Sequence, residues 1–294
     1  NITRDLKHEM IQLANNSSRQ QVWNMWKRCF GDPDNYMELY FRDKYRPENT
    51  LLYMEGTTAV ASLQMLDYKF SFHGKEIPVI YLSGVCTLPE YRKRGYTRAL
   101  LIEGFNVAKR RGVPLMLLVP QEKWLMELYA KYGFARAFDP GTAELPSLKE
   151  LMSKHRWNLR EAYNEFDRYY RKQDMTVQKT FDDFKAIVDE GALFDFPPKK
   201  NLIGMARVID AQYLLSLFDE GYKGKPFAIS VKDELIEENN IALPAQAEAT
   251  GHVAIQVDIG DLAQLLLGYH TGEREEPYSK IFPEKSPVMN FMLE

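Results

Sequence analysis

One short turn constrains this chain more than any other feature, because it joins an apolar strand directly to a helix. The strand is expected over Val79–Val85, and the helix that follows carries Leu101, Phe105 and Ala108 on one apolar face, at the spacing i, i+4, i+7. Alternating strands and helices of this kind are typical of α/β folds. The turn is therefore expected at the end of a strand, beside the first turn of a helix.

The turn is basic and contains one glycine. Arg92, Lys93 and Arg94 supply full positive charges, and Gly95 lets the main chain approach a ligand closely. The first N–H groups of a helix have no intrahelical partner, and the helix dipole adds partial positive charge there. The pattern indicates an anion site that suits phosphate. The competing interpretation is a solvated basic turn, since runs of Arg and Lys are usually surface charge.

The spacing within the turn distinguishes between kinds of phosphate loop. It contains neither the Gly-x-x-x-x-Gly-Lys-Ser/Thr run of a Walker loop nor the three spaced glycines of a dinucleotide fingerprint. It reads Arg92-x-x-Gly95-x-Thr97. This resembles the Gln/Arg-x-x-Gly-x-Gly/Ala pyrophosphate loop of the GCN5-related N-acetyltransferases, the GNAT superfamily. The chain departs from that pattern at Thr97, where the family has a small residue.

A second segment carries the same resemblance. Residues 115–120 form a short apolar run bounded by prolines, which fits a buried parallel strand. A helix pattern follows and stops at a glycine. Its end, Leu128-Tyr129-x-Lys131-x-Gly133-Phe134, is similar to the Leu-Tyr-x-Lys-x-Gly-Phe signature of the same superfamily. Two motifs in the right order are more specific than one, and the resemblance covers roughly residues 1–140.

The resemblance implies an α/β (α+β) fold, with a mixed sheet flanked by helices. Helical patterns fill the region from Thr3 to Phe30, with Ser17 or Ser18 as the expected N-cap. Hairpin turns are expected at residues 55–56 and 73–74, between strand patterns. These strand patterns cover Thr50–Glu55, Thr58–Tyr68 and Ile77–Val85.

The resemblance also implies acetyl-CoA as the cofactor and assigns residues to it. In the family fold, the strands near Val85 and Leu115 separate, and the pantetheine arm lies between them. Amides from Lys93 to Thr97 would hold the pyrophosphate, while Arg92 and Arg94 screen its charge. The predicted cofactor-binding residues are Val85, Thr87, Arg92, Lys93, Arg94, Gly95, Tyr96 and Thr97.

The chemistry is attack of an amine on a thioester, and it needs a proton donor for the departing thiolate. Tyr129 is the predicted donor, since a phenol with a reference pKa of ~10 stays protonated at neutral pH. The alternative is an amphipathic core residue, and Tyr132 is the second choice as donor. A base is harder to assign, because the strand over Pro78–Val85 has no carboxylate. Either water relays the proton, or another part of the chain supplies the carboxylate.

The remainder of the chain divides into two regions. Residues 141–200 are predicted to form a helical connector, with helical spacing at 148–152, 159–170 and 181–188, and a break at Pro197–Lys200. Residues 201–294 form an α+β pattern that resembles the sterol-carrier-like domain of the enhanced intracellular survival family. In that family the C-terminal carboxylate reaches the active site, which carries over to Glu294 as a second catalytic residue. The predicted domains are therefore 1–140, 141–200 and 201–294.

Composition limits the class of protein. The chain has no apolar run long enough to cross a bilayer and no signal-peptide pattern, and its two cysteines, Cys29 and Cys86, favour a reduced, cytoplasmic protein. The five histidines show no metal-ligand spacing, so no metal is expected. Residues 201–294 hold seven Lys and Arg against fifteen Asp and Glu, a net charge of −8, which leaves +5 for residues 1–200. An acidic lobe would attract a cationic amine and repel nucleic acid, or it merely aids solubility.

The leading hypothesis is an acetyl-CoA-dependent N-acetyltransferase that acts on a small or peptidyl primary amine. Relatives in the family are often oligomeric, so a homo-oligomer is a possible assembly. The alternative is a CoA-binding sensor, or a lipid or small-molecule carrier, without catalysis. Thr97 and the missing strand carboxylate favour this alternative.

Overall fold

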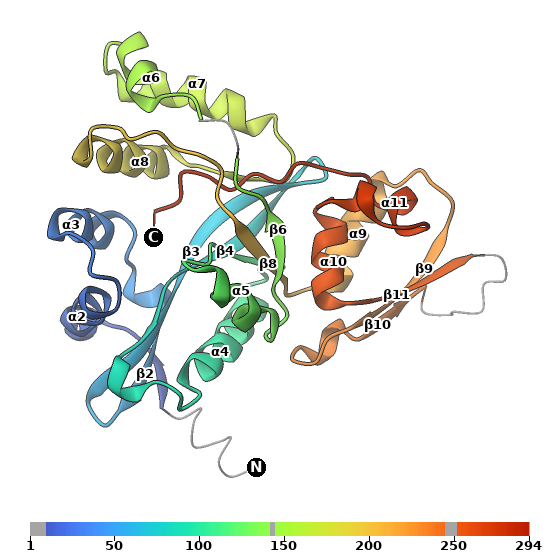
Figure 1. Ribbon diagram of the computed structural model, residues 1–294, viewed down its shortest axis with the longest axis horizontal. Coiled ribbons are helices and arrows are strands. Elements are labelled where there is room, and N and C mark those ends of the chain that lie inside the picture. The colour runs from blue at the N-terminus through green and yellow to red at the C-terminus, as the bar shows by residue number, and fades with distance from the viewer. Residues whose placement is uncertain (1–9, 142–144, 245–251, 294) are drawn as a thin grey trace.

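The structure is a computed structural model, and it describes residues 10–141, 145–244 and 252–293. Within these residues a large mixed sheet and a smaller three-stranded sheet lie side by side (Figure 1). The large sheet has the order β1-β2-β3-β4-β5-β8-β6, and β7 pairs with β3 off this path. Its strands are β1 (Ile11–Leu13), β2 (Thr50–Glu55), β3 (Thr58–Phe72), β4 (Lys75–Thr87), β5 (Leu115–Leu118), β6 (Ala135–Phe138), β7 (Thr176–Gln178) and β8 (Gly204–Val208).

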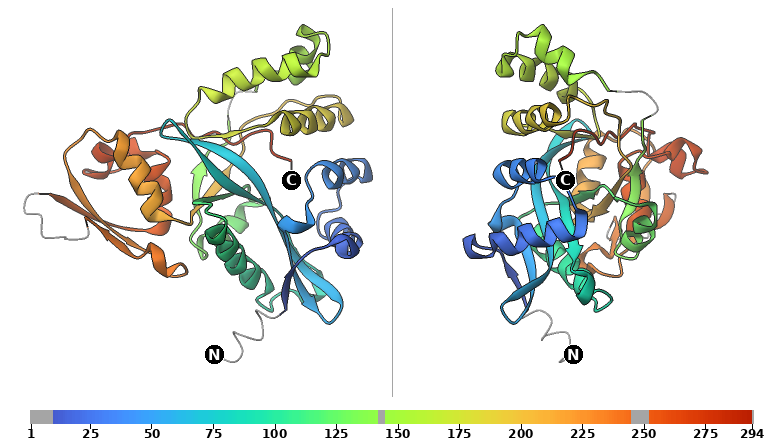
Figure 2. Two further views of the ribbon diagram at one scale, coloured as in Figure 1. Left: turned by 180° about the vertical axis from the view of Figure 1, so that it is seen from behind. Right: turned by 60° about the vertical axis from the view of Figure 1, so that its left-hand side comes forward.

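Helices cover both faces of the large sheet. Helices α2 and α3 lie on one face and α4 on the other, as the two views of Figure 2 show. The helices of this part are α2 (Arg19–Phe30), α3 (Asp34–Asp43), α4 (Tyr96–Arg110), α5 (Lys123–Ala130), α6 (Leu148–Lys154), α7 (Leu159–Arg171) and α8 (Phe181–Leu193). The predicted fold class, a mixed sheet flanked by helices with a smaller α+β part, is confirmed.

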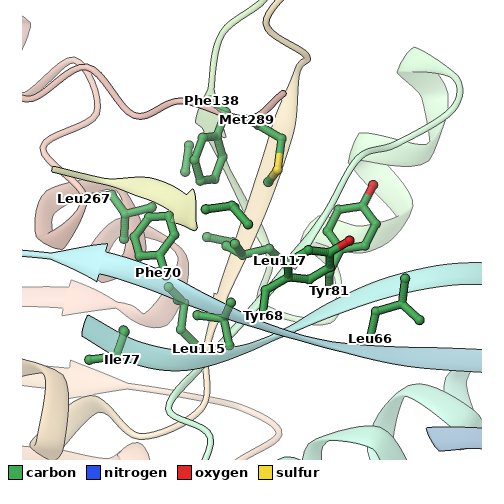
Figure 3. Packing of buried hydrophobic residues seen from close by; sticks show 14 of the residues in the cluster. Leu66, Tyr68, Phe70, Ile77, Tyr81, Leu115, Leu117, Phe138, Leu267 and Met289 are labelled. Atoms are coloured by element: carbon green, nitrogen blue, oxygen red, sulfur yellow. The ribbon is translucent and has the colours of Figure 1, made fainter. Parts of the chain in front are cut away.

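Successive side chains along a strand point to opposite faces of the large sheet, and this produces two buried cores. In β5, Leu115 and Leu117 face one buried cluster, while Met116 and Leu118 face the other. A strand buried on both faces has no polar alternation, which is why residues 115–118 read as a continuous apolar run. Figure 3 shows the first cluster, in which side chains of β3, β4 and β5 meet Phe138, Leu267 and Met289 from distant parts of the chain.

The N-terminal helical expectation is wrong over residues 11–13. This segment is the edge strand β1, whose Ile11 pairs with Tyr53 and whose Leu13 pairs with Leu51 of β2. Residues 1–9 lie outside the described part of the chain. The local helical spacing is overridden because β2 offers backbone hydrogen bonds to this segment. Ser18 precedes α2 as expected, but its hydroxyl accepts from the backbone of Asn15 rather than capping α2.

Residues 141–200 leave and rejoin the large sheet beside one another, and between these points β7 pairs with β3. The N–H of Gly141 donates to the carbonyl of Asn201 at 3.1 Å, and the N–H of Leu145 donates to that of Lys199 at 2.7 Å. The strands on either side, β6 and β8, are neighbours in the sheet, and β8 also pairs with β5. The first strand of the predicted 201–294 domain thus lies in the large sheet, between β5 and β6.

The remaining C-terminal elements build the smaller lobe. They are α9 (Ala211–Gly221), β9 (Phe227–Lys232), β10 (Ile241–Leu243), β11 (Val253–Asp258), α10 (Ile259–Leu266) and α11 (Tyr278–Ile281). Strand β9 is central, antiparallel to β10 and parallel to β11. After α11 the chain runs back across the large sheet (Figure 2), where the N–H of Leu202 donates to Met289 and the N–H of Val288 to Met175. The sterol-carrier-like identity of this lobe stays a prediction.

One buried ion pair joins the large sheet to the smaller lobe. Arg207 of β8 is fully buried and binds the carboxylate of Asp233 through two hydrogen bonds, of 2.6 and 2.9 Å. It also donates from Nε to the carbonyl of Tyr132 at 2.8 Å. Asp233 in turn accepts from Asn239 and from the backbone N–H groups of Leu235 and Ile236. Arg207 and its neighbours hold the pKa of Asp233 below its usual range, against the effect of burial.

We predict that Asp233→Ala lowers the free energy of unfolding by about 3–5 kcal/mol, because it leaves a buried guanidinium without a counter-charge. The double variant Arg207→Met/Asp233→Leu removes both charges. Its free energy of unfolding is expected to fall by less than that of Asp233→Ala alone. Denaturant unfolding followed by circular dichroism measures both. A single variant as stable as the unmodified protein would contradict this role of the pair.

Candidate functional site

Strands β4 and β5 pair over a short stretch and then separate. The parallel register runs from Val79 opposite Leu115 to Tyr81 opposite Leu117, whereas β4 continues to Thr87. Beyond Tyr81 the side of β4 that faces β5 has no strand pairing within the described residues. An unpaired strand edge presents backbone N–H and C=O groups that an extended ligand can bind.

A bulge lies in this unpaired part of β4. The register with β3 shifts between Ser62 and Gln64, so that Ser83 and Cys86 both have partners and the residues between them do not. Gly84 there has φ +59°, and a Cβ at this position would lie 2.7 Å from the Trp26 ring. The sequence carries a signal for this feature, because an isolated glycine inside a strand pattern indicates a bulge. The bulge at Gly84 is not among the features predicted from the sequence.

The basic turn leads into the uncapped start of α4. Gly95 has φ +81° in the left-handed region, and α4 begins at Tyr96 without a side-chain cap. Arg92, Lys93 and Arg94 are all exposed. Exposed cations thus lie beside a helix N-terminus whose first N–H groups lack intrahelical partners. This geometry agrees with the anion site that the sequence predicts.

Two hydrogen bonds attach the turn to the end of β4. Arg92 donates from Nε to the carbonyl of Thr87 at 3.1 Å, and the hydroxyls of Thr87 and Thr97 lie 3.1 Å apart. Thr97, the one departure from the family pattern, therefore links the last residue of β4 to the first turn of α4. The threonine pair fixes the distance between the strand end and the helix start.

Glu55, at the end of β2, contacts the other side of the turn. It forms an ion pair with Arg94 at 3.3 Å and accepts a short hydrogen bond from the Tyr96 hydroxyl. The Tyr96 ring stacks on Tyr53 with 3.9 Å between centroids. The hydrogen bond to Glu55 raises the pKa of Tyr96 above its ordinary value. Neither Glu55 nor Tyr53 was identified from the sequence, because β2 and the turn are about 40 residues apart and no local signal joins them.

Tyr129, near the end of α5, is buried in one of the two cores. It is 7% exposed and packs edge-on against Phe134 at 5.6 Å. Leu82 of β4 and Leu118 of β5 belong to the same buried cluster, and Val85 packs against it. The structure thus brings Tyr129 and the predicted cofactor strand together in one cluster. Glu294, the other predicted catalytic residue, lies outside the described residues.

A polar cluster adjoins the bulge on the face covered by α2 and α3. The hydroxyl of Tyr40 donates to Gln64 Oε1 at 2.7 Å and lies 2.8 Å from the hydroxyl of Ser83. Among the described residues, Gln64 Nε2 is a buried donor without a partner. No local sequence pattern indicates this cluster, because its members come from three separate elements.

The two cysteines meet at the end of β4. Cys29, at the end of α2, lies 3.6 Å from the carbonyl of Thr87 and beside Cys86. A hydrogen bond from Cys86 and the charges of Arg92 and Arg28 lower the pKa of Cys29 to about 7, against the effect of burial. The pKa of Cys86 is raised, by its contact with Cys29 and by burial. A partly exposed thiol beside cations is therefore the more nucleophilic of the two.

The described residues contain no group of three or more His, Cys, Asp or Glu side chains placed to hold a metal ion. None of the helices in this part of the chain combines the length and apolar character needed to span a bilayer.

Comparisons with known proteins agree with this geometry. Residues 10–137 match the family model of the acetyltransferase (GNAT) domain. A GCN5-related N-acetyltransferase from Anabaena variabilis has a similar structure, with a TM-score of 0.65, 14% identity, and coverage of 96% of this chain and 99% of that chain. Eis1 from Mycobacterium abscessus has a TM-score of 0.61 and 13% identity, and the match covers 95% of this chain and 96% of that chain. A GCN5-related N-acetyltransferase from Kribbella flavida has a TM-score of 0.61 and 14% identity, and the match covers 95% of this chain and 97% of that chain. At these identities the structures establish the fold alone. No curated protein matches the chain. The predicted GNAT resemblance is confirmed.

We predict that iodoacetamide alkylates Cys29 with a rate that rises with pH to a plateau, with its midpoint near the Cys29 pKa of about 7. Cys86 is expected to react far more slowly in the folded protein. Mass spectrometry of quenched samples gives both rates. In Cys86→Ala the midpoint is expected at higher pH, because a hydrogen bond that stabilises the thiolate is lost; equal midpoints in the two proteins would contradict this cause.

Proposed function

We propose that this chain is an N-acetyltransferase that transfers the acetyl group of acetyl-CoA to a primary amine, since residues 10–137 match the family model of the acetyltransferase (GNAT) domain. The observation that carries the proposal is the separation of β4 from β5, directly before a basic turn at an uncapped helix start. The unpaired edge suits an extended amide-bearing chain, and the turn suits its phosphates. A single long donor molecule with both parts fits both features.

The residues proposed to hold the donor are those predicted from the sequence. Backbone groups of Val85 and Thr87 would bind the amide-containing arm, as a neighbouring strand would. Amides from Lys93 to Thr97 would bind the diphosphate, and the exposed side chains of Arg92 and Arg94 would neutralise it. Arg94 must give up its ion pair with Glu55 before it can contact a phosphate. Its contribution to the binding of the donor is therefore expected to be smaller than that of Arg92.

Tyr129 is proposed as the general acid that protonates the departing thiolate. What supports this role is that Tyr129, at the end of α5, belongs to the same buried cluster as Leu82 of β4 and Leu118 of β5. Its neighbour Phe134 orients the ring through edge-on contact and cannot itself donate a proton. Tyr132 follows on the same turn and is the natural comparison residue.

The general base remains a prediction from the sequence. Strand β4 (Lys75–Thr87) contains one carboxylate, Glu76. Glu76 lies at the start of the strand, away from the bulge. Carboxylate from another part of the chain is therefore required, or water relays the proton. Glu294 is the proposed source of that carboxylate. A net charge of −8 over residues 201–294 would favour a cationic acceptor.

The function is tested by thiol release from acetyl-CoA in the presence of polyamines, aminoglycosides and lysine peptides. Amine-dependent release, with the acetylated product identified by mass spectrometry, supports the proposal. Tight binding of CoA without turnover on any amine would instead favour a CoA-binding sensor.

We predict that Tyr129→Phe lowers kcat at least about a hundredfold, because general acid catalysis typically contributes 10²–10⁴-fold, and leaves CoA affinity unchanged. Steady-state kinetics and calorimetry separate the two quantities. Tyr132→Phe is the control and is expected to keep most of the activity. An unchanged kcat in Tyr129→Phe would remove this residue from the mechanism.

We predict that Arg92→Gln/Arg94→Gln weakens CoA binding by ~1–3 kcal/mol, through loss of charged hydrogen bonds. Lys109→Gln, at the opposite end of α4, removes one charge on the same helix and is expected to bind CoA normally. Titration calorimetry measures the dissociation constants. If the double variant and the Lys109 control bind equally well, the assignment of the turn is wrong.

A further inference from the structure

A second cavity lies far from the acetyl-transfer site. It has a volume of about 700 Å³, is partly open to solvent, and is lined by β3, the start of β4, the segment after α4, α7 and the turn from β7 into α8. Its lining includes Val79, whereas the bulge and the basic turn are at the other end of β4. Val79 and Val85 are about 20 Å apart along the strand, at ~3.3 Å per residue. The cavity is therefore separate from the gap between β4 and β5.

Lys179 is the unusual residue of this cavity. It is 4% exposed, and its Nζ donates one hydrogen bond, of 3.3 Å, to the carbonyl of Val177. An ammonium group has three protons to donate. Among the described residues, no carboxylate forms an ion pair with it. Burial lowers the pKa of Lys179 to about 7, with a further lowering from the charge of Lys44 that Asp183 opposes.

Asp183, the carboxylate whose charge acts on Lys179, already binds other groups. Asp183 Oδ1 lies 2.5 Å from Nζ of Lys44, which is itself largely buried. Its Oδ2 accepts from the N–H of Thr180 at 2.8 Å, in the capping box of α8. One carboxylate therefore serves two buried ammonium groups, and its short contact is to Lys44. The other carboxylates that line the cavity, Asp67 and Glu76, form no ion pair with Lys179.

Two arginines add to this excess of positive charge. Arg111 and Arg160 line the same cavity, and neither forms an ion pair with a described residue. Arg111 donates to Asn49 Oδ1 and to a backbone carbonyl, and the Arg160 guanidinium lies 3.6 Å from the centre of the Phe181 ring. Arg171, by contrast, is paired with Asp167 and Glu76.

The charged and titratable groups of this region come from every surrounding element. They are Asp67, Tyr68, Lys69 and Glu76 from β3 and β4, Lys44 after α3, Arg111 after α4, Arg160, Tyr163 and Arg171 from α7, and Asp183 from α8.

We propose that this cavity binds a small oxyanion, a carboxylate or a phosphate, through the ammonium group of Lys179, with Arg111 and Arg160 supplying further positive charge. The aromatic rings of Tyr68, Tyr163 and Phe181 line the same cavity and suit an apolar part of the ligand. A bound anion stabilises the protonated amine, so binding takes up a proton wherever Lys179 is neutral in the free protein. Anion binding at this site is therefore accompanied by proton uptake, which binding to an exposed, already protonated lysine would not show.

The test is titration calorimetry of the full chain at pH 8 with inorganic phosphate and with citrate, in buffers of different ionisation enthalpy. We expect binding of one or both anions, accompanied by proton uptake. Lys179→Met is expected to weaken binding about tenfold or more and to abolish the proton uptake, since hydrogen bonds to charged groups are the strong ones. Lys172→Met, which removes an exposed lysine outside the cavity, is the control and is expected to bind as the unmodified protein does.

Three results would overturn the proposal: no binding of either anion at millimolar concentration, binding without proton uptake, or equal binding by the Lys179 and Lys172 variants. If Lys179→Met does not fold, Arg160→Gln, at an exposed side chain, is expected to weaken binding several-fold, and unchanged affinity in that variant also counts against the site. Comparison of the affinities for phosphate and for citrate shows whether the site prefers a phosphate or a carboxylate. Saturating CoA is expected to leave the affinity unchanged, whereas competition would place the anion in the acetyl-transfer site.

Discussion

The ion pair of Arg207 and Asp233 is the interaction on which the arrangement of the two sheets depends. Arg207 belongs to β8, between β5 and β6, and Asp233 belongs to the smaller lobe. The guanidinium also binds the carbonyl of Tyr132, and a Cβ at Gly133 would lie 2.6 Å from its Cζ. Gly133 is thus required by the arginine that docks the lobe. The turn that contains Tyr132 and Gly133 directly follows Tyr129. The contacts of Arg207 therefore hold both the smaller lobe and the end of the helix that carries the proposed general acid.

The proposed acetyl-transfer site depends on interrupted strand pairing. Tyr81 is the last residue of β4 that pairs with β5, and the bulge at Gly84 changes the direction of the backbone just beyond it. Backbone groups that would otherwise bind a neighbouring strand become available to an extended ligand. The hydroxyls of Thr87 and Thr97 then hold the helix start at the strand end. Thr97, which departs from the family pattern, thus has a structural role in this chain.

The region from 141 to 200 adds a feature of its own. It brings Lys179 and Asp183 against β3 and beside Lys44, which leaves two buried ammonium groups with one carboxylate. Such an imbalance is costly in a low-dielectric interior unless the amine is neutral or a ligand supplies the charge. The proposed anion site resolves the imbalance without reference to the acetyl-transfer chemistry. The two sites occupy opposite ends of β4.

The sequence by itself determined the features that depend on neighbouring residues. These include the strand, basic turn and helix around Gly95, the hairpins, and most helices, because periodicity and turn residues are local properties. The tertiary structure alone decided that residues 11–13 form a strand and that Glu55 contacts the turn. It also decided that β8 enters the large sheet and that Lys179 lacks a counter-charge. Each of these depends on which distant backbone or side chain comes into contact, and no local pattern in the sequence records that.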